Sequence, residues 1–115
     1  MSENKIWGNT TLIFDNSTLS MYMLNIIKGG CCSRHWHKAK WNLFYVISGI
    51  LGIDIFEGDS NIPRSIVLES GKSYLIKPGV RHRFKGILET QIIEVNYTQL
   101  DPEDIIRENV GSIEE

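Results

Sequence analysis

The stretch that decides the fold runs from Gly30 to Gly49 and reads GCCSRHWHKAKWNLFYVISG. It contains His35 and His37, which lie two positions apart. In an extended chain they point to the same side, because side chains of a strand alternate between its two faces. Two imidazoles directed into a core are costly unless their nitrogens are satisfied. A metal ion satisfies them well, since imidazole is a ligand for zinc, iron, nickel and copper.

The third histidine of the chain, His82, lies in a second short motif, KPGVRH. The chain therefore places its whole histidine supply in two motifs. We predict that these two motifs converge on one site.

Short apolar runs alternate with turn signals along most of the chain, and glycine, proline, asparagine and serine clusters separate them. We predict strands over Leu19–Ile27, Ser33–Lys38, Asn42–Ile47, Ile50–Phe56, Ser65–Leu68, Ser73–Ile76, Val80–Lys85 and Thr90–Tyr97, with a shorter apolar run at Leu12–Phe14. This pattern predicts an all-β fold, either a sandwich or a β-barrel. A jelly roll of two facing sheets is the favoured version.

The two ends of the chain depart from this pattern. The first residues are polar apart from Ile6 and Trp7, and they indicate a loose arm or an edge segment. The segment Asp101–Arg107 predicts a short C-terminal helix, because an aspartate caps helices and proline suits the first helical position.

A length of 115 residues suits one domain. We predict a single domain over residues 1–115, with a core at 12–98, an N-terminal arm at 1–11 and a C-terminal tail at 99–115.

The composition excludes several classes of protein. A net charge of -2 and a pI of about 5.9 argue against a general nucleic-acid binder, which is usually basic. No apolar run approaches the ~18 residues of a membrane-spanning helix, and the start MSENKIWGNT lacks the apolar core of a signal peptide. Cys31 and Cys32 are adjacent and indicate free, inert thiols. We expect a cytoplasmic protein with no nucleic-acid or membrane partner.

With both motifs in view, the chain resembles the cupin superfamily, whose RmlC-like fold is a small jelly-roll β-barrel. In the first cupin motif, a glycine precedes a His-x-His pair, an acidic residue and a closing glycine. Gly29, His35, His37 and Gly49 fall at the required spacing, and Asn42 occupies the acidic position.

The second cupin motif is matched as well. Gly71, Pro78, Gly79 and His82 fall on its positions, with Lys77 where proline is usual. The resemblance spans roughly residues 20–98 and is much more specific than a lone His-x-His pair.

The resemblance implies a divalent metal ion, which could be zinc, iron, manganese or nickel. Its implied ligands are His35, His37, His82 and Asn42. Three neutral histidines and one carboxylate leave a single positive charge around a divalent ion, whereas asparagine in place of glutamate leaves two. An amide oxygen is also a weaker ligand than a carboxylate.

A second resemblance points to a substrate class. The segments SYLIKPGVRHRF and IIEVNYTQLDPEDIIR are similar to the cupin domain of bifunctional mannose-6-phosphate isomerase and mannose-1-phosphate guanylyltransferase proteins. No glycine-rich nucleotide loop is present, so we expect the isomerase-type cupin alone. The first hypothesis is a metal-dependent enzyme acting on a sugar or sugar phosphate. The alternatives are a non-catalytic sugar- or metabolite-binding cupin and a three-histidine iron dioxygenase.

An isomerase requires a base that moves a proton between neighbouring carbons. The sequence leaves the base open among Glu94, Asp54 and Glu57, and the phenols of Tyr45 and Tyr74 could donate hydrogen bonds. Lys38 and Lys40 follow the first histidine motif, where a positive charge would favour an anionic ligand.

Apolar residues on both faces of Asn42–Ile47 predict a central strand or one covered by a partner subunit, and we expect a homodimer. Four aromatic residues are candidates either for a sugar pocket or for the core and dimer interface: Trp36, Trp41, Phe44 and Tyr45.

Overall fold

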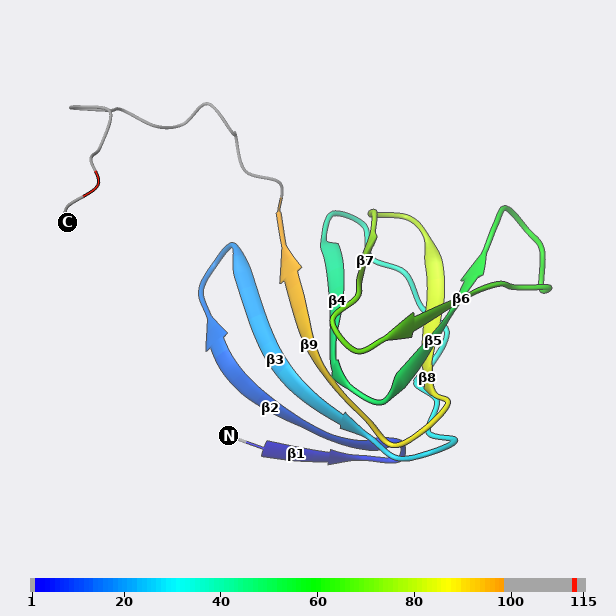
Figure 1. The fold of residues 1–115 in the computed structure, drawn as a ribbon. Coiled ribbons are helices and arrows are strands. Elements are labelled where there is room, and N and C mark those ends of the chain that lie inside the picture. The colour runs from blue at the N-terminus through cyan, green and yellow to red at the C-terminus, as the bar shows by residue number, and fades with distance from the viewer. Residues whose placement is uncertain (1, 99–112, 114–115) are drawn as a thin grey trace.

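The computed structural model describes residues 2–98 and 113, and within them the chain forms two antiparallel sheets and no helix (Figure 1). The strands are β1 (Ser2–Lys5), β2 (Gly8–Asp15), β3 (Leu19–Ile26), β4 (Trp41–Ser48), β5 (Ile50–Phe56), β6 (Arg64–Glu69), β7 (Ser73–Ile76), β8 (Arg81–Gly86) and β9 (Thr90–Tyr97). The predicted helix at Asp101–Arg107 lies outside the described residues.

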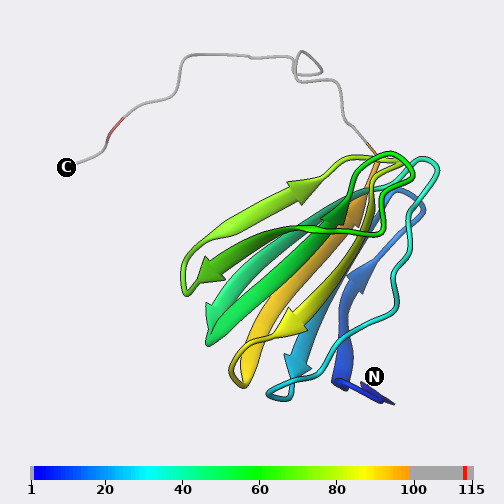
Figure 2. The same ribbon diagram turned by 90° about the vertical axis from the view of Figure 1, so that its right-hand side faces the viewer.

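The two sheets face each other as layers (Figure 2). The larger has the strand order β1-β2-β3-β9-β4-β7, and the smaller has the order β6-β5-β8. Consecutive strands β4 and β5 therefore belong to different sheets, as do β8 and β9. The prediction of an all-β fold with two facing sheets is confirmed.

The hydrophobic core lies between the two layers and follows from strand alternation. On β4, Phe44 and Val46 are buried, whereas Tyr45 between them is exposed. Ile92 on β9 also points inward. The smaller sheet contributes Leu51, Ile53, Ile55, Leu68 and Phe84. The packed hydrophobic core therefore supports the strands that carry the two histidine motifs.

The turn from β4 to β5 depends on Gly49, whose φ of +87° lies in the left-handed region. A Cβ atom at this position would also collide with the carbonyl oxygen of Glu89 and with Thr90. The closing glycine of the first motif is therefore a structural residue at the point where the chain passes between the sheets.

The N-terminal segment, predicted to be a loose arm or an edge segment, contains the edge strand β1 and the first part of β2. Strand β2 is thus longer than the predicted apolar run at Leu12–Phe14. Its first half is polar, and its pairing with β3 places it in the sheet.

The prediction of a regular strand at Ser33–Lys38 is wrong. The segment from Gly30 to Lys40 follows β8 through only two isolated bridges, Cys31 with Lys85 and His35 with His82. Between these bridges the segment advances one residue more than β8 does, as in a β-bulge. The amide of Phe84 donates to the thiol sulfur of Cys32 at 3.2 Å. The extra residue breaks the ladder, although the chain stays beside β8.

In the part of the chain that the structure describes, no helix is long and apolar enough to cross a membrane.

Candidate metal site

The three histidines converge, as the two motifs predict. His35 and His37 come from the segment beside β8, and His82 is the second residue of β8. One ring nitrogen from each lies within 4.8 Å of the others. The ring centroids are 4.6 Å apart for His35 and His82 and 5.1 Å apart for His35 and His37. This spacing allows one ion to contact all three imidazoles.

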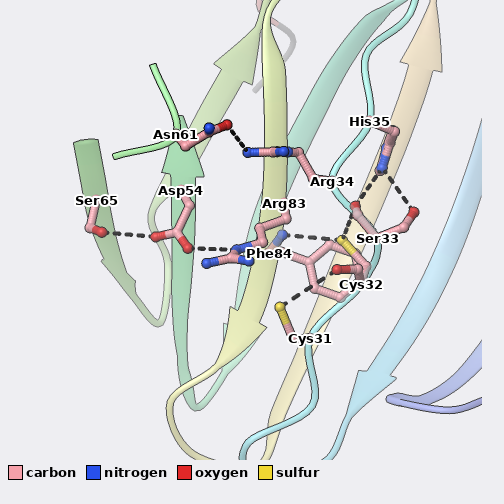
Figure 3. A network of polar contacts seen from close by, with 10 residues as sticks. All are labelled: Cys31, Cys32, Ser33, Arg34, His35, Asp54, Asn61, Ser65, Arg83 and Phe84. Atoms are coloured by element: carbon pink, nitrogen blue, oxygen red, sulfur yellow. Dashed lines mark hydrogen bonds and ion pairs between the residues drawn. The ribbon is translucent and has the colours of Figure 1, made fainter. Parts of the chain in front are cut away.

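Backbone carbonyls fix the orientation of two of these rings. Nδ1 of His35 lies 2.8 Å from the carbonyl oxygen of Ser33 (Figure 3), and Nδ1 of His82 lies 2.9 Å from that of Val80. A carbonyl oxygen only accepts, so each Nδ1 carries the proton and donates. Each Nε2 therefore keeps a lone pair, the arrangement commonly seen when histidine binds a metal.

His82 shows most clearly that the site suits a cation. The residue is 1% exposed, and its Nε2 has no hydrogen-bond partner among the described residues. The pKa of His82 is lowered to about 4, mainly by burial and also by the neighbouring His35 and His37, while the hydrogen bond to the Val80 carbonyl acts in the opposite direction. Burial, with His35 and Lys40 nearby, also lowers the pKa of His37. A buried neutral imidazole with a free Nε2 lone pair, as in His82, fits a divalent metal ion.

Asn42 lies on β4, where strand alternation directs it inward, and it is 1% exposed. Its Nδ2 donates to Oδ1 of Asn96 at 2.8 Å and more weakly to Oε2 of Glu94 at 3.4 Å. Its Oδ1 has no hydrogen-bond partner among residues 2–98. The role of Asn42 as a fourth ligand stays a prediction.

The structure answers a question that the sequence left open, namely which way Glu94 points. Glu94 and Asn96 alternate with outward residues on β9 and share the inner face with the buried Ile92. Burial raises the pKa of Glu94, while hydrogen bonds from Asn42 and Asn96 and the charge of His35 act in the opposite direction. The carboxyl group is thus desolvated and close to the first histidine motif.

A cavity of about 610 Å³ opens at these residues. Its wall includes His35, His37, Glu94, Asn96 and Lys40, whereas His82 is not part of the lining. Two aromatic residues that the sequence did not mark as site residues, Trp7 and Tyr22, also line it. Trp7 packs edge-on against Phe84, with ring centroids 4.9 Å apart.

The other carboxylates considered as bases are engaged elsewhere. Asp54 accepts from Nε of Arg83 at 2.8 Å (Figure 3), and Glu57 accepts from Nε of Arg64 at 2.7 Å. Neither residue lines the 610 Å³ cavity beside the histidines. Among the proposed carboxylates, Glu94 alone faces that cavity.

The two tyrosines considered as proton donors also lie away from the histidines. Tyr45 is 42% exposed on the outer face of β4. Tyr74 lines a separate cavity of about 400 Å³ that contains none of the three histidines.

The four aromatic residues of the first motif region do not line the 610 Å³ cavity beside the histidines. Phe44 belongs to the core and packs edge-on against Phe84. Trp41 stacks on Tyr97, and Trp36 is 51% exposed. Of the two lysines expected near the site, Lys40 lines the cavity and Lys38 does not.

Cys31 and Cys32 are free thiols that line the cavity. Burial raises the pKa of Cys32 to about 12, against the hydrogen bond from the amide of Phe84. Because the thiolate is the nucleophilic form, this environment makes Cys32 unreactive.

Comparison with known proteins identifies the kind of domain. A family model described as "Cupin domain" matches residues 22–93. No curated protein matches the sequence.

Several solved structures share the fold. KdgF from Halomonas sp. superposes with a TM-score of 0.72 at 13% identity, covering 85% of this chain and 86% of that one. An RmlC-like cupin from Shewanella frigidimarina has a TM-score of 0.69 at 20% identity, with 90% and 86% covered. The oxalate decarboxylase of Lactobacillus farciminis, solved as a formate complex, has a TM-score of 0.71 at 19% identity, and the match covers 87% of this chain but 31% of that one. Likeness at these identities concerns the fold alone.

Proposed function

Since the chain belongs to the cupin domain family, we propose that it binds a divalent metal ion through His35, His37 and His82 and acts on a small sugar or sugar phosphate. The reaction proposed is of the mannose-6-phosphate isomerase type. The observation that carries the proposal is the convergence of three imidazoles beside a cavity whose wall includes His35, His37 and the desolvated carboxyl group of Glu94.

The cavity lining supports a sugar ligand. Trp7 and Tyr22 present aromatic surface, and such rings supply large contact area with a polar edge. Asn96 adds an amide that both donates and accepts hydrogen bonds. A pocket that combines apolar walls with a few polar groups is typical of small-molecule sites.

Lys40 supports an anionic group on that sugar. It lines the cavity, as does Lys5, whose Nζ is paired with Glu3 on the same wall at 3.0 Å. A lysine side chain on a cavity wall raises the local concentration of an anion such as a phosphate ester.

A bound metal would supply Lewis acidity toward a carbonyl or hydroxyl oxygen of the ligand. The remaining tasks fall to residues of the chain. The imidazoles of His35 and His82 are held in place by the carbonyls of Ser33 and Val80. The cavity wall carries two carboxylates, Glu3 and Glu94. Glu3 is paired with Lys5, and Glu94 is the one that can accept a proton from the ligand at Oε1 or Oε2.

The test combines metal content with turnover. Purified protein is analysed for zinc, iron, manganese and nickel, then offered mannose 6-phosphate and a panel of other sugar phosphates with each metal added. His35→Ala serves as the variant that should lose the metal. Stoichiometric metal with isomerisation of at least one sugar phosphate supports the proposal. Metal without turnover favours the binding module, and Fe(II)-dependent oxygen uptake favours the dioxygenase.

A homodimer is part of the proposal. On the outer face of the larger sheet lie Leu43, Tyr45 and Ile47 of β4, Ile93 and Val95 of β9, Met21 and Met23 of β3, and Leu75 of β7. The cross-strand register places Leu43 between Val95 and Leu75. The outward residues of these four strands include no charged side chain. An uncharged apolar face suits the same face of a second copy in a two-fold dimer.

A cytoplasmic location remains part of the proposal as well. The two free thiols, Cys31 and Cys32, support a reducing compartment.

A further inference from the structure

The three histidines of the proposed metal site provide no negative charge to balance a divalent ion. Three neutral imidazoles leave both positive charges of a divalent ion uncompensated. The residue at the acidic position of the first motif is Asn42, which is neutral and 1% exposed. A charge removed from water is costly unless an opposite charge lies nearby.

Glu94 is a carboxyl group without an ion-pair partner among the described residues. It is desolvated, and the charges of His35 and Lys40 act on it from beyond ion-pair distance. It lies on the same cavity wall as His35 and His37. Glu94 thus lies beside a cation site that lacks a carboxylate ligand.

Cross-strand pairing explains how the carboxylate is held there. Strands β4 and β9 are antiparallel neighbours, with Asn42 opposite Asn96 and Phe44 opposite Glu94. The Nδ2 group of Asn42 donates to both Asn96 and Glu94. The neutral amide at the family's acidic position therefore contacts a carboxylate on the adjacent strand.

From this geometry we propose that Glu94 supplies the negative charge of the metal site and that Asn42 is the residue that positions it. The inference rests on the proposed function, because it requires that the three histidines bind a metal. Glu94 does not belong to the group of mutually close ligand atoms, which contains only the three histidines. Its carboxylate thus balances the charge from beside the imidazoles.

The test is metal affinity, measured by titrating metal-free protein with zinc or cobalt(II) at neutral pH. Glu94→Gln keeps the shape of the side chain and removes its charge. We expect it to weaken metal binding by about 10- to 100-fold, the usual effect of losing a group that supports metal ligands. Glu69→Gln, on the exposed end of β6, is the matched control and should bind like the unmodified protein.

A rescue variant separates charge from structure. Asn42→Asp in the Glu94→Gln background returns a carboxylate to the site, on β4 in place of β9, and should recover most of the lost affinity. Thermal unfolding gives an independent readout, because a ligand that binds only the folded state raises Tm. The rise in Tm caused by zinc should be smaller for Glu94→Gln than for Glu69→Gln.

The outcomes separate the two proposals. Zinc affinity of Glu94→Gln within twofold of the control, with His82→Ala unable to bind, would overturn the role of Glu94 and leave the three-histidine site intact. No metal binding by the unmodified protein would overturn both. A loss of affinity that Asn42→Asp does not reverse, in a Glu94→Gln protein whose metal-free Tm has dropped, would assign Glu94 a structural role instead.

Discussion

His35 and His82 are joined by two reciprocal backbone hydrogen bonds. The amide of His35 donates to the carbonyl of His82 at 3.0 Å, and the amide of His82 donates to the carbonyl of His35 at 2.9 Å. Their ring centroids lie 4.6 Å apart. These main-chain hydrogen bonds hold the two histidine motifs side by side.

The first prediction concerns the buried histidine. His82→Ala should abolish stoichiometric metal binding, because it removes one of three ligands. Its stability cost should be about 1–3 kcal/mol, since a buried ring is lost from a core that is otherwise intact. Elemental analysis and circular dichroism measure the two effects. Lys85→Ala, on the exposed side of the same strand, is the control, and unchanged metal content in His82→Ala would disprove the ligand assignment.

A second prediction is that acid destabilises the metal-free protein through His82. Its folded pKa of about 4 lies below the ordinary value of 6.5, so between these values the unfolded chain binds a proton that the folded chain does not. The free energy of unfolding should therefore fall as pH drops through this window, by up to about 3 kcal/mol.

Glu94 acts with the opposite sign, because a raised carboxyl pKa makes the folded state bind the proton more readily than the unfolded state. The measurement is therefore a difference between the unmodified protein and His82→Gln in urea denaturation across the window. A steeper acid loss in the unmodified protein is expected. Parallel curves would contradict the pKa direction assigned to His82.

A third prediction compares two glycines that both have positive φ. Gly71 has a φ of +83° and open space where a Cβ would lie, so Gly71→Ala should cost about 1–2 kcal/mol of backbone strain. Gly49→Ala adds a collision with the carbonyl of Glu89 and should cost clearly more. Chemical denaturation of the two variants measures the difference, and equal costs would mean that the β4–β5 turn has room to adjust.

The fourth prediction tests the dimer. Leu43→Glu places a charge in the middle of the outer apolar face, between Val95 and Leu75, and should convert the proposed dimer to monomers. Val67→Glu changes a residue that is 60% exposed on the smaller sheet, and it should leave the dimer unchanged. Light scattering after size-exclusion chromatography reports the mass. A monomeric unmodified protein would refute the dimer itself.

Much of this architecture was readable from the sequence because it depends on local patterns. Alternation and turn residues predicted β4, β5, β8 and β9 close to their observed bounds. The spacing of the two motifs predicted that three distant histidines meet. These features follow from the period of the strand and from glycine turns.

The sequence failed where one extra residue or one neighbouring strand decides the outcome. The bulge beside β8 leaves no mark in composition, so Ser33–Lys38 looked like a regular strand. The direction of Glu94 was left open, although alternation from the buried Ile92 carries that information. Its contact with Asn42 depends on the register of β4 against β9, which a single sequence does not reveal.

The sparse attachment of the histidine segment has a consequence for hydrogen exchange. Between Gly30 and Lys40, backbone pairing to β8 is intermittent, so this segment can open without unfolding the sheets. In the metal-free protein, the amides of Cys32 and His35 should exchange with deuterium well before those of β5. A metal ion bound by both the segment and β8 would slow the exchange of these amides toward the rate of the core. Hydrogen exchange would therefore show whether the metal site is occupied, before any substrate is known.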